Sequence, residues 1–444
     1  STSSRTNTRS SRKNKICDLN RSRLNGQFPR GIAHFFLTRP QFAYLRVHLL
    51  LLLEKDHMHY ILFDGDRREA LLPFTYTRPV AEVRTGILTL REKWERRLGQ
   101  SISWLTEQYL QEKFPLTTGS ENIFINGSLL ADDSLAQAVK ELEKGQALWD
   151  GTQILAYRSP GVDREVALEA FTKKEYTKAY REIRNTWDLF SLNGEALEAD
   201  FKLLTHGRES APLSDTNQVI HQERIFLEEG ATVEYCILNA TAGPVYIGKG
   251  ATVMEGSMIR GGFALGDHSV VKMGAKIYGP TSTGPHCKIG GEINNAVFFG
   301  YSNKGHDGFL GNAVLGEWCN LGADTNNSNL KNNYAKVRLW NYESERFDPT
   351  GLQFCGLIMG DHSKCAINTM FNTGSVVGVS CNIFSAGFPR NFIPSFSWGG
   401  TSGFSTYLPK KAFEAAKVAM ARREVPFTEA DERMLLHIFE ESGK

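Results

Sequence analysis

The sequence of 444 residues lacks a hydrophobic run long enough to cross a membrane, lacks a CxxC pair and carries little net charge. The apolar run at residues 47–53 is far shorter than the roughly 20 residues of a membrane span, and charged residues follow it directly. No small-residue cleavage site follows the run, which argues against a signal peptide. The seven cysteines, an odd number without CxxC spacing, favour reduced structural thiols and a cytoplasmic protein.

The formal charge of +2 hides an asymmetry between the first 57 residues and the rest. Residues 1–57 contain eleven lysines and arginines but three acidic residues, so the remainder of the chain is net acidic. Nothing in the main body therefore indicates nucleic-acid binding. We expect residues 1–57 to be a disordered leader or translated upstream sequence. Met58 is the expected start because residues 58–64 have the pattern of a buried first strand.

A six-residue period dominates residues 247–289. Its positions are Ile247, Val253, Ile259, Leu265, Val271, Ile277, Thr283 and Ile289, all branched aliphatic residues except the β-branched Thr283. This period is typical of a parallel β-helix of hexapeptide repeats, in which each short strand turns one aliphatic side chain into a narrow interior. No coil can bury that side chain alone, so stacked coils share one continuous core.

Two interruptions of the period are candidate positions for function. We expect a loop at residues 294–308 and a polar insertion from residue 326 to about residue 353, with the repeats continuing to Ile383. Loops that leave a solenoid at such breaks commonly carry binding or catalytic residues.

The regions on either side of the repeats have different patterns. Apolar strands at residues 60–63, 102–104 and 122–126 and a helix over residues 86–98 predict a sheet with flanking helices and a ligand crevice at the strand ends. Near the C-terminus, Pro409 is suited to begin a helix and Thr428 begins a capping box with Asp431. The expected parts are therefore the leader 1–57, an α/β domain at 58–208, the β-helix at 219–400 and C-terminal helices at 409–444.

His306 lies in the first interruption, among glycines and asparagines and away from a core position. A neutral imidazole placed there can accept the proton of an amine or hydroxyl group that attacks a thioester. The alternative is a surface histidine with no role in catalysis.

Residues 306–325 resemble the acetyltransferase coil of the bifunctional N-acetylglucosamine-1-phosphate uridyltransferase/glucosamine-1-phosphate acetyltransferase family. The chain from Met58 resembles the divergent, Bacteroidetes-type members of that family. The resemblance implies a nucleotidyltransferase-like α/β domain, a left-handed β-helix and a homotrimer with sites between subunits. It implies that His306 is the general base and that Asn320 and Asn329 bind substrate. The family's phosphate-binding arginine cannot be placed in this sequence, and Lys272, Lys276 and Lys304 are the candidates for its role.

Residues 61–65 and 72–79 resemble a degenerate sugar nucleotidyltransferase signature, in which loop amides and cations bind phosphates. Residues 123–128 resemble a strand that ends in a metal-binding Asp, but Ser128 stands at that position. A neutral hydroxyl is a poor sole ligand for Mg²⁺, so the metal ligands stay unassigned. The nucleotide-binding candidates are Gly65, Arg68, Thr77, Arg78, Asn126 and Gly127.

The expected function is acetyl-CoA-dependent N-acetylation of glucosamine 1-phosphate, followed by uridylyl transfer from UTP to N-acetylglucosamine 1-phosphate with Mg²⁺. One alternative is an acyltransferase whose N-terminal domain only binds a nucleotide-sugar. The other is a non-catalytic trimeric scaffold that binds sugar nucleotides.

Overall fold

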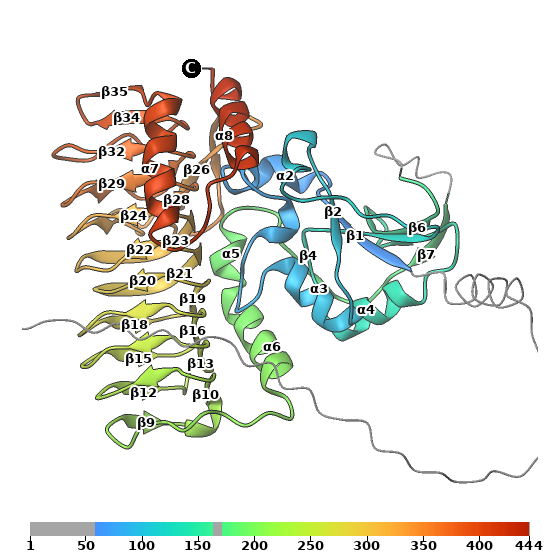
Figure 1. The fold of residues 1–444 in the computed structure, drawn as a ribbon, viewed down its shortest axis with the longest axis horizontal. Coiled ribbons are helices and arrows are strands. Elements are labelled where there is room, and N and C mark those ends of the chain that lie inside the picture. Colours follow the sequence, from blue (N-terminus) through green and yellow to red (C-terminus); the bar gives the residue numbers. More distant parts are fainter. Residues whose placement is uncertain (1–57, 163–170, 444) are drawn as a thin grey trace, which may run out of the picture. The chain divides into compact units, whose positions relative to one another are not determined.

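The computed structural model describes residues 58–162 and 171–443, so the predictions for residues 1–57 lie outside the described chain. The predicted fold class is confirmed: an α/β domain is followed by a left-handed parallel β-helix and two C-terminal helices (Figure 1). None of the helices in these residues is both long enough and apolar enough to cross a membrane.

The α/β domain is built on a six-stranded sheet. Strand β1 (His59–Phe63) lies between β2 (Ser103–Leu105) and β3 (Asn122–Asn126) and is parallel to both. Beyond β3 follow β6 (Ile154–Ser159), which is antiparallel to β3, then β5 (Gln146–Trp149) and β7 (Thr172–Glu175). The small strands β4 (Leu129–Leu130) and β8 (Arg181–Glu182) pair with each other. The helices are α2 (Arg67–Ala70), α3 (Leu90–Leu98), α4 (Asp133–Lys140), α5 (Asp188–Ser191) and α6 (Asn193–Thr205).

Helix α3 is shorter than the helix predicted over residues 86–98. The Thr89 hydroxyl accepts a hydrogen bond from the Glu92 amide at 3.2 Å, and the Glu92 carboxylate accepts one from the Thr89 amide at 2.7 Å. This capping box fixes the helix start at Leu90. Ile87 therefore precedes the helix, and its amide donates instead to the Asp200 carboxylate of α6 at 2.9 Å.

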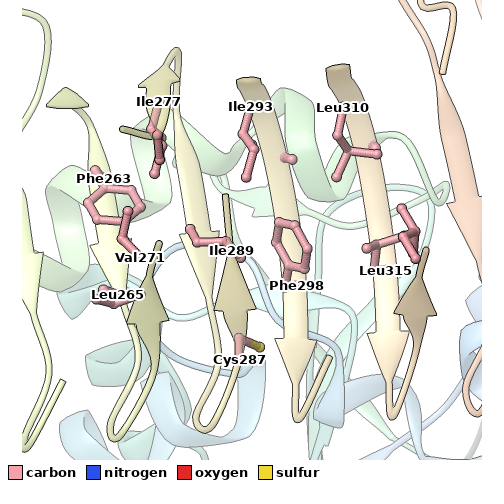
Figure 2. Close-up of a cluster of buried hydrophobic side chains, with 14 of the residues drawn as sticks. Phe263, Leu265, Val271, Ile277, Cys287, Ile289, Ile293, Phe298, Leu310 and Leu315 are labelled. Atoms are coloured by element: carbon pink, nitrogen blue, oxygen red, sulfur yellow. The ribbon is translucent and has the colours of Figure 1, made fainter. Parts of the chain in front are cut away.

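The β-helix forms because the hexads place one aliphatic residue on each short strand. Val253 pairs with Val271, and Ile259 with Ile277, so strand partners lie three hexads apart and each coil contains three strands. Val271, Ile277 and Ile289 point into the shared interior (Figure 2) and have at most 1% of their surface exposed. Burying one such side chain contributes about 1.5–3 kcal/mol, and the array repeats this gain coil after coil.

The strands of the β-helix repeat in chain order on successive coils. The first half comprises β9 (Gln218–Ile220), β10 (Ile225–Leu227), β11 (Thr232–Val233), β12 (Ile237–Asn239), β13 (Val245–Ile247), β14 (Thr252–Val253), β15 (Met258–Arg260), β16 (Phe263–Leu265), β17 (Val270–Val271), β18 (Lys276–Tyr278), β19 (Thr281–Thr283), β20 (Lys288–Ile289) and β21 (Glu292–Gly300). The second half comprises β22 (Asn303–Lys304), β23 (Phe309–Glu317), β24 (Asn320–Leu321), β25 (Asn326–Asn327), β28 (Leu357–Met359), β29 (Lys364–Cys365), β30 (Met370–Phe371), β31 (Ser375–Val377), β32 (Asn382–Ile383), β33 (Phe392–Ile393), β34 (Ser397–Gly400) and β35 (Gly403–Thr406).

The loop predicted at residues 294–308 is wrong over most of its length. Residues 292–300 form the long strand β21, which pairs with β18, β19 and β23. Asn295 adopts a left-handed conformation with φ +50°, which asparagine tolerates better than most residues, and this lets the chain turn the corner within the strand. Ile293 and Phe298 fill the core on either side of it (Figure 2).

The polar insertion after residue 326 contains a hairpin. Strands β26 (Arg338–Asn341) and β27 (Arg346–Pro349) pair in antiparallel fashion. Leu339 of this hairpin is buried in a cluster that also contains Phe74 and Val80 of the α/β domain and Phe299 and Val314 of the β-helix. The insertion and the α/β domain thus cover one outer face of the β-helix together.

The C-terminal segment forms α7 (Pro409–Ala421) and α8 (Glu429–Glu441). Pro409 begins α7, and the capping box of Thr428 and Asp431 begins α8, as predicted. Met434 and Leu435 of α8 pack in a buried cluster with Leu110 of the α/β domain. The two helices therefore connect the end of the β-helix to the α/β domain.

Candidate functional site

The α/β domain contains a pocket of about 530 Å³ at the carboxyl ends of β1, β2 and β3. We call it the α/β pocket. The chain passes from β1 to β2 on one side and then to β3 on the other, and such a reversal opens a crevice between loops that diverge from the sheet. Its lining includes Gly65 and the polar residues Asp64, Asp66, Arg67, Arg68, Thr106, Glu107, Asn126, Thr152 and Gln153.

Asp64, directly after β1, is a buried acid of the α/β pocket. Its carboxylate accepts hydrogen bonds from the Val80 amide at 2.7 Å and from the Thr106 hydroxyl. Burial nevertheless raises the pKa of Asp64 to about 6. The sequence predictions did not include Asp64, although a carboxylate directly after a buried strand is a signal that could have found it.

The predicted nucleotide-binding residues of the α/β pocket are largely engaged with their own domain. The Arg68 guanidinium donates to the Thr75 carbonyl and to the Tyr109 hydroxyl. The side-chain oxygen of Asn126 accepts a hydrogen bond from the Ser128 hydroxyl at 2.7 Å. Arg68 and Asn126 line the pocket, but their hydrogen-bonding capacity is already partly used.

The two glycines have distinct structural requirements. Gly65 adopts φ +57°, the left-handed conformation that costs glycine least. A Cβ atom at Gly127 would lie 3.0 Å from the Phe63 carbonyl oxygen, to which the Gly127 amide donates. Both glycines thus allow the backbone segments after β1 and β3 to pack closely at the end of β1.

Thr77 and Arg78 lie outside the α/β pocket, at the junction with the β-helix. The Thr77 hydroxyl donates to the Asp361 carboxylate at 2.8 Å, and the Arg78 guanidinium forms a buried ion pair with the same carboxylate. Arg78 also lies 3.4 Å from Glu317. This geometry argues against the predicted role of Thr77 and Arg78 in nucleotide binding, because both side chains hold two domains together.

The residues at Ser128 do not fit the metal site that the resemblance would place there. Ser128 is fully buried, and its hydroxyl contacts Asn126 and the Glu182 carboxylate. Glu182 in turn accepts hydrogen bonds from Arg67 and Arg184 at 2.7 Å each. In the described residues, no group of three or more His, Cys, Asp or Glu side chains could hold a metal ion.

His306 lies on an exposed turn between β22 and β23. Lys304 orders this turn from inside the β-helix: its ammonium group donates to the carbonyl oxygens of Gly290 and Asp307 at 3.1 Å each, and to that of His306. Only 1% of the surface of Lys304 is exposed. This position argues against the predicted contact between Lys304 and a substrate phosphate and makes Lys304 a positioning residue for the His306 turn.

The other two lysine candidates differ in their place on the β-helix. A Cβ atom at Gly305 would meet both Lys272 Cγ and Lys288 Cβ at 3.8 Å, so these two lysine stems pass beside the residue that precedes His306. Lys276 is exposed on β18, in register with Glu292 of β21. Lys272 is therefore brought near His306, and Lys288 is a neighbouring cation that the sequence predictions missed.

The two asparagine candidates are also separated by the structure. Asn320 is exposed and lines a groove between the β-helix and α7. The Asn329 amide group donates to the Asn312 side chain at 2.8 Å. In this conformation Asn329 ties the polar insertion to β23, whereas Asn320 is open to a ligand.

The buried cysteines fit the prediction of structural thiols. Cys287, Cys319 and Cys365 are buried as free thiols in the core of the β-helix. Burial raises the pKa of Cys287 to about 12, so this thiol is protonated at neutral pH and a poor nucleophile.

One comparison with known proteins falls on the α/β domain. Residues 60–209 match a family model described as sugar nucleotidyl transferase. The α/β domain is similar to sugar nucleotidyl transferases. The chain is also 30% identical over 90 residues to the bifunctional protein GlmU of Methanocaldococcus jannaschii, a match that covers 20% of this chain and 21% of the relative. The chain thus matches about a fifth of the length of that curated relative.

Two solved structures have low similarity to the chain. A UDP-N-acetylglucosamine acyltransferase from Arabidopsis is 16% identical with a TM-score of 0.20, covering 48% of this chain and 80% of that protein. A hexapeptide transferase family protein from Anaplasma phagocytophilum is 14% identical with a TM-score of 0.14, covering 46% and 87%.

Proposed function

We propose that the protein is a bifunctional transferase of sugar-nucleotide synthesis. The β-helix would transfer the acetyl group of acetyl-CoA to the amine of glucosamine 1-phosphate. The α/β domain would then join N-acetylglucosamine 1-phosphate to the uridylyl group of UTP and release pyrophosphate. The observation that carries the proposal is the α/β pocket, which lies at the carboxyl ends of parallel strands within residues 60–209, the part similar to sugar nucleotidyl transferases.

In the acetyl transfer, the sugar amine attacks the thioester carbonyl carbon and coenzyme A leaves as the thiol. The His306 imidazole accepts the amine proton as the new C–N bond forms. Lys304 supports this step by fixing the backbone of the His306 turn. Lys272 places positive charge beside that turn, where the sugar phosphate would bind.

In the uridylyl transfer, a phosphate oxygen of the sugar phosphate attacks the α-phosphorus of UTP and pyrophosphate leaves. Arg67 and Arg68 line the α/β pocket, and their positive charges stabilise the negative charge of the transition state. Above pH 6 the Asp64 carboxylate holds the Val80 amide and the Thr106 hydroxyl, which fixes the wall of the pocket.

A homotrimer in the cytoplasm is part of the proposal. Ile237 and Met258 lie side by side on neighbouring coils and are each 43% exposed, an apolar strip that a second copy of the chain could cover. The buried free thiols of the β-helix suit a reducing compartment. The mass of the protein in solution tests the trimer.

A second candidate keeps the acyl transfer but makes the α/β domain a nucleotide-sugar binding module. The observation in its favour is that Ser128 stands where the resemblance places a metal-binding carboxylate, and that Thr77 and Arg78 are engaged at the junction. Binding of a nucleotide-sugar without release of pyrophosphate would favour this candidate.

The test measures both activities on the full chain. One assay follows coenzyme A release from acetyl-CoA with glucosamine 1-phosphate, and the other follows pyrophosphate release from UTP with N-acetylglucosamine 1-phosphate and Mg²⁺. His306→Ala is expected to slow acetyl transfer by about 100-fold or more and to leave pyrophosphate release unchanged. The matched control is His221→Ala, another exposed histidine of the β-helix domain. Acetyl transfer at the wild-type rate in His306→Ala would remove His306 as the base.

A further inference from the structure

Helix α7 and one face of the β-helix enclose a groove of about 750 Å³, which we call the α7 groove. The β-helix contributes Lys288, Asn303, Asn320 and Lys364, from strands that stack one above another. The turn that follows α7 contributes Arg422 and Arg423. With Lys411 of α7, which pairs with Glu414, five cations line one space, and the other four are Lys288, Lys364, Arg422 and Arg423.

The charges of these four cations are not balanced by protein carboxylates. In the described residues, no ion pair involves Lys288, Lys364, Arg422 or Arg423. The acid that lines the groove is Glu414, and it contacts Lys411 at 3.0 Å. The Lys364 ammonium group donates to the His362 carbonyl at 3.0 Å, a neutral partner.

The pKa of Lys288 is consistent with this excess of positive charge. The pKa of Lys288 is lowered mainly by the positive charge of Arg423. Burial and the charges of Lys272 and Arg422 lower it further. Burial lowers the pKa of Lys364. Lys288 is therefore repelled by Arg423 and Arg422, and a bound anion would relieve this repulsion.

The remaining lining of the α7 groove suits an organic anion. The rings of Tyr301 and Trp318 line it and are stacked with their centroids 4.2 Å apart. Asn303 and Asn320 add amide donors and acceptors. A groove of this volume is large enough for a nucleotide, and cations with neutral hydrogen-bonding groups and aromatic rings are the surroundings that a nucleotide requires.

We propose that the α7 groove binds a nucleotide with two or more phosphate groups, held by Lys288, Lys364, Arg422 and Arg423. The arginines supply paired donors for phosphate oxygens, and the lysines supply point charges. Such a ligand has two sources in the proposed function: the nucleotide end of the acyl donor and the uridine nucleotides of the α/β domain. The binding itself does not depend on either proposed reaction.

The test is calorimetric titration of the full chain with adenosine 3′,5′-bisphosphate, UDP and inorganic pyrophosphate, each at low and moderate salt. Arg423→Gln is expected to weaken the preferred ligand about tenfold or more, because a hydrogen bond to a charged group is lost. The matched control is Lys410→Gln, which removes an exposed α7 cation that does not line the groove. Lys288→Gln provides a second groove variant, at an exposed position of β20.

The probes distinguish the sources of the ligand. Preference for adenosine 3′,5′-bisphosphate would identify the nucleotide end of the acyl donor, and preference for UDP the uridine nucleotides. UDP that binds equally well to wild type and Arg423→Gln is bound elsewhere, and such a result counts against the groove. The proposal is overturned if pyrophosphate binds as tightly as both nucleotides, if none of the three probes binds, or if Arg423→Gln and Lys288→Gln weaken binding no more than Lys410→Gln does.

Discussion

The junction between the α/β domain and the β-helix and the α7 groove both bring cations to the surface of the same β-helix, but they treat the charge differently. At the junction, Arg78 is buried against Asp361 and close to Glu317, so the protein supplies the opposite charge itself. In the α7 groove, the positive charges of Lys288 and Arg423 repel each other, and neither residue forms an ion pair with an acidic residue of the described chain. The paired charges at the junction stabilise the contact between the two domains, whereas the unpaired cations of the groove can bind a ligand.

The most severe test of this comparison is removal of the junction carboxylate. Asp361→Ala leaves Arg78 buried without its main partner and takes the acceptor from the Thr77 hydroxyl. Breaking a buried ion pair in this way typically costs about 3–5 kcal/mol. We expect a loss of this size in the free energy of unfolding, measured by urea denaturation.

The control for the junction is an exposed ion pair of the insertion hairpin. Asp348→Ala removes the partner of Arg346 at 2.9 Å, and the arginine is largely in solvent. Surface pairs of this kind contribute about 0–1 kcal/mol. A loss in Asp361→Ala no larger than that in Asp348→Ala would show that the junction pair does not stabilise the fold.

Lys304 is an intermediate case, because its buried ammonium group donates hydrogen bonds to carbonyl oxygens and the carboxylates of Asp307 and Asp324 act on it without forming an ion pair. Burial lowers its pKa to about 8, compared with about 10.4 in an unfolded chain. Between these values the unfolded chain binds more protons, so the contribution of Lys304 to stability rises with pH. We expect wild type to gain up to about 3 kcal/mol relative to Lys304→Met from pH 7 to pH 10.

The measurement is urea denaturation of both proteins at several pH values. Lys249→Met, at an exposed position of the β-helix, is the control and should show no such trend. A constant difference between wild type and Lys304→Met from pH 7 to pH 10 would contradict the lowered pKa. Acetyl transfer by Lys304→Met should also decline, because the His306 turn loses the ammonium group that orders it.

The sequence predicted the β-helix well because one local rule repeats. Each hexad places a residue such as Val271 or Ile277 in the core without reference to distant parts of the chain. The rule failed at residues 294–308, where β21 turns a corner at Asn295 and two core residues five positions apart replace the hexad. A period of six cannot represent a strand that continues through a corner.

The candidate sites were harder to predict, because contacts between distant segments decide them. Arg78 follows the pattern of a phosphate-binding residue, but the acceptor that occupies it, Asp361, lies 283 residues away. In the sequence, Lys304 has the pattern of an exposed loop lysine, but in the folded β-helix its side chain is buried. Lys288 and Arg423 belong to a strand and to the turn after α7, and no motif in either segment predicts that they meet.

The smallest expected effect concerns stability in the α7 groove. Lys288→Gln removes one of several like charges, so we expect the free energy of unfolding to stay constant or to rise by about 0.5 kcal/mol at low salt. The effect should disappear as salt screens the repulsion, because the Debye length falls to about 8 Å at physiological ionic strength. Urea denaturation at low and moderate salt measures both expectations. A clear loss of stability in Lys288→Gln would mean that this lysine has a stabilising partner. The contrast between paired charge at the junction and unpaired charge in the groove would then not hold for Lys288.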